Sequence, residues 1–583
     1  MAKIEEIRHS LAHLLAAAVQ KHFPKTKLGM GPAIENGFYY DFLFEKPISE
    51  KDLKKLEEEM RNLISQNLPF ERQIWSYKKA KEFFKDQFFK LELIEEKSDK
   101  KTIQIYKTGN FFDFCKGGHV KNTKEINPDA FCLQRIAGAY WKGNEKNQML
   151  TRIYGLAFKT KKELEDFLEQ QKQIEKNDHR KIGAQQELFF FHEMVGPGLV
   201  LWLPKGTIIR QELEKWAVTT EKKWGYLRVA TPHVAKEELF KTSGHLPYYQ
   251  DAMYPKMVLD DAVYYLKAMN CPMHHLIFKA KPRSYKELPL RLAEYGDDYR
   301  YEKSGELFGL MRVRGMRMND AHIYCTKEQA IEEFVNVIKL HQYYYEKLGI
   351  KNYYMELSLR DPKKKKKYLG SEKMWQDAED FMKRAMEKSN VPYVVTQEGA
   401  AFYGPKIDFQ IKSAIGRIFT ASTNQIDFFM AERFDLEYTD KNGLKKRPVI
   451  IHRAPLGTHE RFIGFLIEHF KGSFPVWLAP EQVWVLPISQ KHLTFAKKIV
   501  AELFEKEIRV VLKPEEQTLP KRIKEGIEQK IPYLIIIGDK EVKENIISVR
   551  QRGNAKTVSI PFSNFLQKIS KEIQEKTLSL ETL

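Results

Sequence analysis

The segment Tyr299–Cys325, YRYEKSGELFGLMRVRGMRMNDAHIYC, constrains the fold and chemistry of this chain more than any other. Two extended stretches flank a polar loop that contains Gly305 and Gly309, which is typical of a β-hairpin. Residues two apart on a strand share a face, so Arg300 and Glu302 are predicted to point the same way. Such a pair can hold opposite ends of a nucleotide, although an isolated Arg-x-Glu is equally typical of a solvated surface hairpin.

The size and charge of the chain indicate several domains and a polyanionic partner. Its 583 residues, 43% of them hydrophobic, are enough for three or four domains of roughly 150 residues each. Lys plus Arg exceed Asp plus Glu by 97 − 78 = 19. This excess and a pI near 9.3 favour nucleic acid as a partner, although a generally Lys-rich proteome gives the same number.

The cysteines and the N-terminal segment predict a cytoplasmic protein. The cysteines are widely spaced and too few to staple a chain of this size, which indicates a reducing compartment; they are Cys115, Cys132, Cys271 and Cys325. The N-terminus, MAKIEEIRHSLAHLLAAAV, has acidic residues and no basic region before its apolar run, unlike a signal or transit peptide. Because no apolar run reaches about 18 residues, no membrane span is predicted.

Two histidine and cysteine pairs stand out in the first part of the chain. His9 and His13 lie four apart on one face of a predicted amphipathic helix. Cys115 and His119 have the same spacing but flank a Gly-Gly turn. The four side chains could form a zinc site of mixed sulfur and nitrogen ligands. They could equally be two core histidines and an unrelated loop cysteine.

A second set of possible metal ligands begins with Cys271 in the segment YYLKAMNCPMHHLIF. A zinc ion that acts on a substrate keeps about three protein ligands and leaves one position open. From the residues alone, Cys271 could combine with any of five other side chains, namely His274, His275, His322, Cys325 and His452.

The hairpin segment resembles motif 2 of class II aminoacyl-tRNA synthetases, and its ending, GLMRVRG followed by DAHIYC, is similar to the threonyl-tRNA synthetase family. The resemblance implies that Arg300 holds the α-phosphate and the amino-acid carboxylate, and that Glu302 reads the adenine amino group. VIIHRAPLGTHERFIGFLIEHF looks like motif 3, which places Arg461 on the γ-phosphate opposite Arg312. An Arg in the first turn of a helix also aims its charge at phosphate together with the helix N-terminus. By resemblance the adenylate pocket further contains Met269, Tyr403, Lys406 and Gln425.

The same resemblance selects Cys271, His322 and His452 as ligands of one zinc ion, with Mg²⁺ accompanying ATP. Threonine and valine have similar sizes, and shape separates such pairs by only about 100-fold. Zinc coordinated by the threonine amine and hydroxyl would reject valine, and Asp320 is implied to pair with threonine beside the metal. Serine also offers a hydroxyl, and its missing methyl yields only about 1 to 3 kcal/mol of discrimination. A second, hydrolytic site is therefore expected.

RHSLAHLLAAAV, GPAIENGFYYDF, DFCKGGHV and GAYWKGNEKNQMLTRIYG resemble the editing domain of bacterial threonyl-tRNA synthetases, which hydrolyses seryl-tRNA formed in error. The resemblance implies a hydrolytic cleft rather than a tightly held metal, formed by His9, His13, Cys115 and His119. It also implies that Lys90 and Asp113 position the ester or its attacking water. Family members usually carry one more small N-terminal domain, whereas this sequence begins at the editing segment.

The expected fold is a multidomain α/β and α+β protein with four consecutive parts. These are an α+β editing domain at 1–158, a linker helix at 159–182, a class II antiparallel-sheet catalytic domain at 183–475 and an α/β anticodon-binding domain at 476–583. Alternating strands and helices predict a mostly parallel sheet in the last part. There, GDKEV and VRQRG resemble segments in which Glu541 and Arg550 read anticodon bases. Helix 206–225 and the strand after it resemble motif 1, the usual dimer element.

The resemblance implies tRNA(Thr), ATP and L-threonine as partners of a homodimer. The sequence departs from the family pattern at four pocket positions, Met316, Met318, Thr420 and Thr458. Methionines can pack against adenine or ribose but donate no hydrogen bond. Two alternatives are a non-catalytic RNA-binding paralogue, which has no need of the Arg and Glu set, and a related synthetase for proline or serine, which has no need of the Cys-His-His set.

Overall fold

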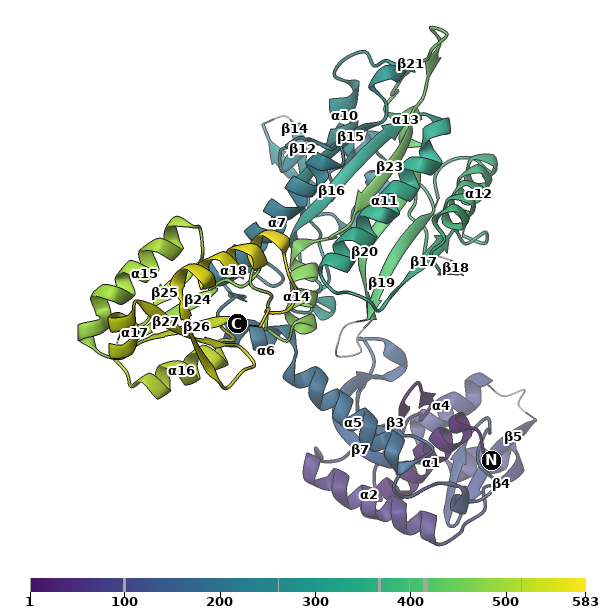
Figure 1. Cartoon of the computed structure of the whole chain (residues 1–583). Helices are drawn as coiled ribbons and strands as arrows, with labels where there is room; N and C mark the ends of the chain where they lie inside the picture. Colours follow the sequence, from purple (N-terminus) through teal and green to yellow (C-terminus); the bar gives the residue numbers. More distant parts are fainter. Residues whose placement is uncertain are drawn as a thin grey trace. The chain divides into compact units, whose positions relative to one another are not determined.

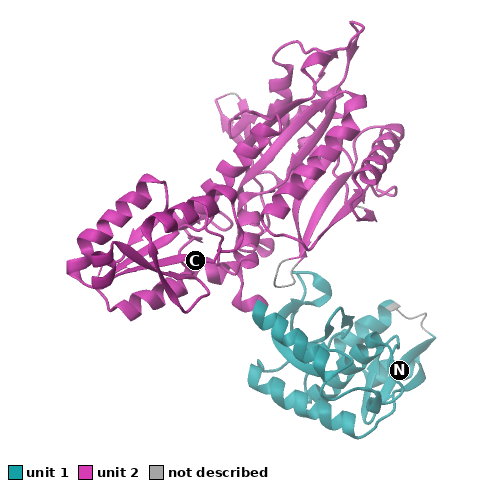
Figure 2. Cartoon of the chain, viewed as in Figure 1, with its two compact units in different colours: residues 1–173 teal, residues 174–583 magenta. Residues whose placement is uncertain are grey.

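The computed structural model describes residues 2–97, 101–260, 262–364, 368–397, 399–412, 418–514 and 516–582. The chain divides into two compact units, Met1–Gln173 and Ile174–Leu583 (Figure 2). Within the described ranges, no helix is both long and apolar enough to cross a membrane.

The first unit is built around helix α1 (Ile4–His22), whose apolar residues Leu11, Leu14 and Leu15 are fully buried. Acidic residues in its first turn and basic residues in its last turn complement the helix dipole. It packs against helix α2 (Glu50–Ser65) and a sheet in the order β1-β3-β8-β7, with β2 paired to β3. The strands are β1 (Lys27–Leu28), β2 (Ala33–Ile34), β3 (Gly37–Leu43), β7 (Phe131–Tyr140) and β8 (Met149–Ala157).

A second, three-stranded sheet in this unit has the order β4-β5-β6 and a separate small core around Trp75, Ile103 and Ile105. Its strands and the neighbouring helices are β4 (Glu71–Ser76), α3 (Tyr77–Phe83), α4 (Phe88–Lys97), β5 (Thr102–Thr108) and β6 (Phe111–Phe114).

The predicted linker helix at 159–182 is two helices rather than one. Helix α5 (Lys161–Lys176) ends before Asp178, and helix α6 (His179–Gln185) begins directly after it. The Asp178 carboxylate accepts a hydrogen bond of 2.8 Å from the backbone N–H of Arg180. Asp is a strong N-cap residue, so it starts a new helix here instead of continuing the old one.

The larger part of the second unit is built on an eight-stranded sheet with the strand order β11-β15-β16-β23-β20-β19-β17-β18 (Figure 1). Its pairings are antiparallel except for β11–β15 and β17–β18, which confirms the predicted antiparallel catalytic sheet. The strands are β11 (Leu227–Arg228), β15 (Leu290–Tyr299), β16 (Gly315–Cys325), β17 (Tyr353–Leu359), β18 (Tyr393–Gln397), β19 (Lys406–Lys412), β20 (Ile418–Asp427) and β23 (Val449–Ala454).

Long helices share one large apolar core with this sheet; they are α7 (Pro204–Lys223), α11 (Lys327–Lys347), α12 (Glu372–Ser389) and α14 (His459–His469). Smaller elements surround them: β9 (Phe189–Phe190), β10 (Leu201–Trp202), β12 (Val234–Lys236), α8 (Glu237–Thr242), α9 (His245–Tyr248), β13 (Met257–Leu259), β14 (Ala262–Leu266), α10 (Cys271–Lys279), α13 (Met430–Arg433), β21 (Tyr438–Thr439) and β22 (Lys445–Lys446). Helix α10 brings Cys271 to the sheet.

The C-terminal part has a five-stranded sheet in the order β25-β24-β26-β27-β28. The β25–β24 and β24–β26 pairings are parallel, whereas the β26–β27 and β27–β28 pairings are antiparallel. The sheet is therefore mixed, and the expectation of a mostly parallel sheet was wrong. Residues 538–545, between β26 and β27, are too few for the crossover that a parallel neighbour needs. The elements are β24 (Val483–Pro487), α15 (Leu493–Glu505), β25 (Val510–Leu512), α16 (Leu519–Glu528), β26 (Tyr533–Ile537), α17 (Asp539–Glu544), β27 (Ile546–Gln551), β28 (Thr557–Pro561) and α18 (Phe562–Glu575).

Candidate functional site

A cavity of about 460 Å³ lies on the eight-stranded sheet and contains most of the residues predicted for the catalytic site. Its lining combines the end of β15 and the middle of β16 with β19, β20, β23 and the first turn of α14. The predicted residues found in this lining are Met269, Cys271, Arg300, Asp320, His322, Tyr403, Lys406, Gln425, His452 and Arg461. Glu302 and Arg312 lie outside the lining.

The hairpin of β15 and β16 ends its ladder one residue before Arg300. Tyr299 pairs with Gly315, and the backbone N–H of Arg300 extends the pairing with a 2.9 Å bond to the Arg314 carbonyl. The chain then turns, because the N–H of Glu302 donates to the Arg300 carbonyl at 2.9 Å. Arg300 and Glu302 therefore do not alternate along one strand, and the predicted shared face is wrong.

The two side chains also have different partners. Arg300 donates through Nε to the Ala268 carbonyl at 3.2 Å and lines the cavity. Glu302 accepts from Arg312, with 2.8 Å between Oε2 and Nη2, and the same Arg312 nitrogen lies 2.6 Å from Glu306. The Arg312 side chain is 45% exposed, so this ion pair is at the surface of the loop.

Helix α14 carries Arg461 in its first turn, and Thr458 caps the helix. The Thr458 hydroxyl accepts from the Arg461 N–H at 3.3 Å. The guanidinium donates to the carbonyls of Met311 at 3.0 Å and Thr420 at 3.3 Å. Burial, together with the nearby charge of Arg300, lowers the Arg461 pKa below its ordinary value. Main-chain acceptors thus fix the guanidinium, which has no ion pair with a carboxylate among the described residues, and this suits a phosphate-binding group.

A compact set of metal-binding donors forms where α10 meets β16 and β23. Cys271 is the first residue of α10, and His322 and His452 lie directly opposite each other in the β16–β23 ladder. The three donor atoms all lie within 4.8 Å of one another, and the three residues are buried. One thiol and two imidazoles fit a zinc ion that keeps an open position.

Neighbouring contacts distinguish this set from the other combinations that the sequence allowed. His275 Nδ1 lies 2.9 Å from the Tyr324 hydroxyl, and the Cys325 thiol faces the Val449 carbonyl at 3.7 Å. His452 Nε2 lies 3.1 Å from Asp427, which leaves Nδ1 as its available nitrogen. A carboxylate behind a metal-binding imidazole fixes the tautomer and ring orientation.

The substrate-facing side chains surround the metal-binding donors. Asp320 is two residues before His322 on β16 and accepts from the Asn270 amide at 3.1 Å. Tyr403 donates to Gln425, which pairs with His452 across β20 and β23. Lys406 Nζ lies 2.7 Å from Asp408 on the same strand. The cavity thus offers a carboxylate and an amide beside the metal donors and cations further along.

Two further acidic side chains near the site, Asp298 and Asp427, were not predicted from the sequence. Asp298 lines the cavity, is 1% exposed and receives an amide hydrogen bond of 3.3 Å from Asn270. Burial raises its pKa to about 8. Because Asp298 is two residues before Arg300 near the end of β15, the alternation of a strand was the signal that could have found it. Asp427, at the end of β20, has no comparable sequence signal.

The departures from the family pattern have different environments. Met318 and Thr458 line the cavity, as does Thr420, whose carbonyl binds Arg461. Met316 is buried and is not part of that lining.

The first unit contains a second cavity, of about 510 Å³, whose lining includes all the predicted editing residues except His119, which contacts Cys115 behind it. Cys115 Sγ lies 3.2 Å from His9 Nε2 and 3.3 Å from His119 Nε2, and the His13 ring packs edge-on against His119. Gly117 and Gly118 have φ of +92° and +88°, a conformation that favours glycine and turns the chain so that His119 reaches Cys115.

Lys90 and Asp113 form a buried ion pair of 2.6 Å in the same cleft, and Tyr40 donates to Asp113 at 2.7 Å. Tyr40 was not predicted from the sequence. Burial lowers the pKa of His13 to about 3 and that of His119 to about 2, so both are neutral near pH 7. His9, Cys115 and His119 hold donors within 4.8 Å of one another, so this set is also a possible metal site.

The predicted anticodon residues lie on α17 and β27. Both carboxylate oxygens of Glu541 have partners inside the domain: Ser548 donates at 2.6 Å and the Gly538 N–H at 2.8 Å. Glu541 therefore caps α17 and braces β27. Arg550 is two residues after Ser548 on β27 and lines a small cavity of about 260 Å³.

Comparisons with known families and proteins agree with this arrangement. Residues 257–470 match the family described as tRNA synthetase class II core domain (G, H, P, S and T). Residues 482–572 match an anticodon binding domain, and residues 103–154 match the threonyl and alanyl tRNA synthetase second additional domain.

The threonine–tRNA ligase of Oceanobacillus iheyensis is 45% identical over 578 residues, covering 99% of this chain and 89% of that protein. That of Gloeobacter violaceus is 43% identical over 585 residues, covering 99% and 93%. A solved structure of the RNA binding domain of threonyl-tRNA synthetase from Cryptosporidium parvum is 35% identical, with a TM-score of 0.65, and covers 70% of this chain and 99% of its own. Identity at this level over nearly the whole chain means that the chain belongs to the threonine–tRNA ligase family of class II aminoacyl-tRNA synthetases.

Proposed function

We propose that this chain joins L-threonine to tRNA(Thr) in two steps. Threonine first attacks the α-phosphate of ATP, giving threonyl-adenylate and diphosphate, and the threonyl group then passes to the tRNA with release of AMP. Mg²⁺ accompanies ATP. The observation that carries this proposal is that Cys271, His322 and His452 meet in the same cavity as Asp320 and Arg300.

Different basic residues bind different parts of the ATP molecule. Arg300, at the cavity wall, holds the α-phosphate and the threonine carboxylate, where negative charge develops during the attack. Arg461 and Arg312 hold the γ-phosphate, and Lys406 lies along the adenylate. Glu302 and Arg312 pair with each other, so binding adenine and phosphate through these two side chains exchanges their ion pair for contacts with ATP.

The Cys271, His322 and His452 donors fit one zinc ion per chain. When bound, zinc supplies coordination sites for the threonine amine and hydroxyl, and valine has no oxygen to offer there. Asp320 binds the ammonium or hydroxyl of the same substrate, and Met269, Tyr403 and Gln425 enclose it.

The cleft of the first unit hydrolyses seryl-tRNA(Thr) formed in error. Its neutral imidazoles and the buried Lys90–Asp113 pair can position a water molecule and the ester, which is general acid–base work that needs no metal. His9, His13, Cys115 and His119 are the groups nearest the reacting bond.

The remaining parts contribute tRNA binding and assembly. The domain boundaries at 158, 182 and 475, a homodimer formed through α7 and β11, and cytoplasmic localisation complete the proposal. Arg550 contacts the anticodon, and Glu541 supports that surface through Ser548. Molar mass in solution measures the dimer.

The decisive test is ATP–diphosphate exchange with each amino acid in turn. Threonine should support exchange, valine should not, and serine should support it weakly. Exchange with proline or serine alone would indicate a related synthetase, and no exchange with any amino acid would indicate an RNA-binding paralogue.

Metal analysis tests the zinc part of the proposal. The purified chain should hold about one zinc ion, and Cys271→Ala should lose nearly all of it because two imidazoles alone bind zinc weakly. His9→Ala should keep its zinc, since we place none in the editing cleft. Zinc retained by Cys271→Ala would mean that the ligands are wrong.

A further inference from the structure

A buried row of polar side chains, His274 and Glu294, continues from His322. His274 Nδ1 is 2.8 Å from His322 Nδ1. The other nitrogen of His274, Nε2, has no hydrogen-bond partner among the described residues, and the Glu294 carboxylate lies 3.5 Å from it. All three residues are at most 3% exposed.

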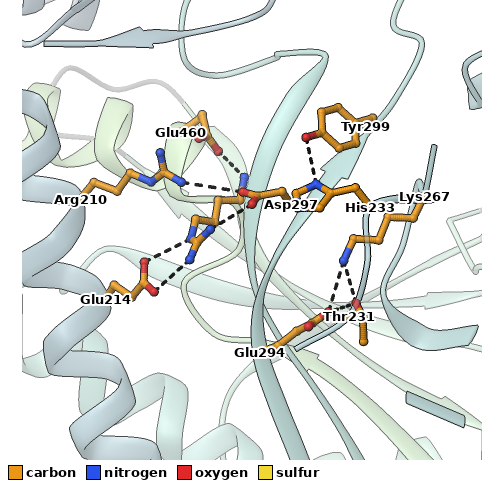
Figure 3. A network of polar contacts seen from close by, with 10 residues as sticks. Arg210, Glu214, Thr231, His233, Lys267, Glu294, Asp297, Tyr299 and Glu460 are labelled. Atoms are coloured by element: carbon orange, nitrogen blue, oxygen red, sulfur yellow. Dashed lines mark hydrogen bonds and ion pairs between the residues drawn. The ribbon is translucent and has the colours of Figure 1, made fainter. Parts of the chain in front are cut away.

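Glu294 is itself held in place by two further groups. Figure 3 shows its contacts with Thr231, whose hydroxyl donates at 2.8 Å, and with Lys267, whose ammonium lies 3.4 Å away. Burial by itself would raise the pKa of Glu294, but the contacts with His274, Lys267 and Thr231 outweigh it and lower the pKa. Glu294 is therefore a carboxylate, a group that attracts a proton to the nearby nitrogen of His274.

Only one arrangement of protons on His274 and His322 leaves Nε2 of His322 free to bind a metal ion. If His274 Nε2 carries its proton toward Glu294, then His274 Nδ1 accepts and His322 Nδ1 must donate. His322 Nε2 is then left with its lone pair. In the opposite arrangement His322 accepts at Nδ1 and carries its proton on Nε2, which blocks metal coordination.

We propose that His274, backed by Glu294, is a positioning residue that holds the proton of His322 on Nδ1 and so presents Nε2 to the metal ion. This inference rests on the proposed zinc site. It assigns a role to one of the two adjacent histidines that the sequence left undecided.

His275 provides a matched control next to His274 on α10. Both histidines are fully buried and each makes one short hydrogen bond, but the partner of His275 is the Tyr324 hydroxyl at 2.9 Å. Replacing either with Phe removes one buried hydrogen bond of similar length. A merely structural role would therefore affect both variants alike.

The test measures zinc affinity of the full chain, stripped of metal and titrated against a chromophoric chelator. His274→Phe should raise the zinc dissociation constant by about 10- to 100-fold, the usual effect of losing an outer partner of a ligand. His275→Phe should leave it at the parent value. His274→Asn, whose amide can stand near the lost Nδ1, should recover part of the affinity, and Glu294→Gln should lose part of it.

The visible absorption of the cobalt-substituted chain gives a second readout, because it reports ligand geometry independently of activity. The spectrum should change in His274→Phe and stay unchanged in His275→Phe. Parent affinity and spectrum in His274→Phe would overturn the positioning role while leaving the zinc site intact. Equal losses in both Phe variants would show a structural effect and also overturn it. A parent chain that binds no zinc would overturn both the positioning role and the proposed metal site.

Discussion

At the scale of single residues, Asp320 is the hairpin residue that we propose takes part in substrate selection. It lies on the same side of β16 as His322. Among the described residues, its carboxylate accepts one side-chain hydrogen bond, from the Asn270 amide at 3.1 Å. A charge-assisted hydrogen bond to threonine is worth about 1.5 to 3 kcal/mol. Asp320→Ala should therefore lower kcat/KM for threonine at least about 10-fold in ATP–diphosphate exchange.

The control for this variant is its metal content and thermal stability. Zinc should stay bound, because Asp320 is not among the three donors. Normal threonine kinetics in a folded, zinc-loaded Asp320→Ala chain would remove Asp320 from the site and leave it a role in supporting the hairpin.

The buried histidines of the proposed editing cleft should make the first unit less stable against unfolding in acid. Imidazoles in the unfolded chain take up protons near pH 6.5, whereas burial lowers the folded-state pKa of His13 to about 3. The unfolded state then binds more protons below pH 6.5, so the free energy of unfolding falls as the pH falls. His13 should contribute about 1.4 kcal/mol of this loss per pH unit.

Denaturant unfolding of the parent and of His13→Phe at several pH values between 7.5 and 5 measures this contribution. Phe keeps the aromatic packing against Phe111, whose ring centroid is 4.7 Å from that of His13. The variant should lose less stability on acidification than the parent. If the free energy of unfolding falls equally with pH in the parent and the variant, the pKa of His13 is not lowered in the folded chain.

At the scale of elements, the N-terminus of α14 is expected to affect both the stability of the chain and the proposed ATP binding. Thr458 is a Thr N-cap whose hydroxyl binds the N–H of Arg461, the residue proposed to hold the γ-phosphate. Replacing such a cap with Ala costs about 1 kcal/mol. Thr458→Ala should lower the unfolding temperature and raise KM for ATP, because the first turn of the helix loosens.

Thr458→Ser keeps the capping oxygen and loses only a methyl group, so it should stay close to the parent in both measurements. If Ser and Ala variants behave alike, the cap does not hold Arg461, and the two main-chain carbonyls that Arg461 contacts are sufficient.

At the scale of the whole molecule, the two compact units predict separable activities. The residues proposed for editing all belong to unit Met1–Gln173, and those proposed for ATP and zinc binding all belong to unit Ile174–Leu583. His9→Ala combined with His13→Ala should leave threonine activation unchanged while seryl-tRNA(Thr) accumulates.

His22→Ala is the matched control, because His22 ends the same helix α1 and lies near Glu59 instead of the cleft. It should deacylate seryl-tRNA at the parent rate. Deacylation at that rate by the double variant would refute the editing assignment, and a loss of threonine activation would refute the separation of the two units.

The amino-acid sequence by itself determined the family, the order of the parts and the antiparallel catalytic sheet. The reason is that the motifs read along the chain resemble those of one family, and this resemblance implies both the order of the parts and the catalytic sheet. Alternation on β16 placed Asp320 and His322 on one side without any knowledge of the neighbours.

The residues by themselves left open which distant side chains meet, and the tertiary structure decided it. His452 reaches His322 because β23 is the neighbour of β16, and strand order is not written in local spacing. The same holds for Asp427 behind His452 and for His274 behind His322. Glu302 left the face of Arg300 because the chain turns directly after the strand, and Asp178 divided the linker helix because its carboxylate caps a new helix. A polar group in a folded chain bonds to the partner that packing brings within reach, and this packing depends on contacts between segments that are far apart in the sequence.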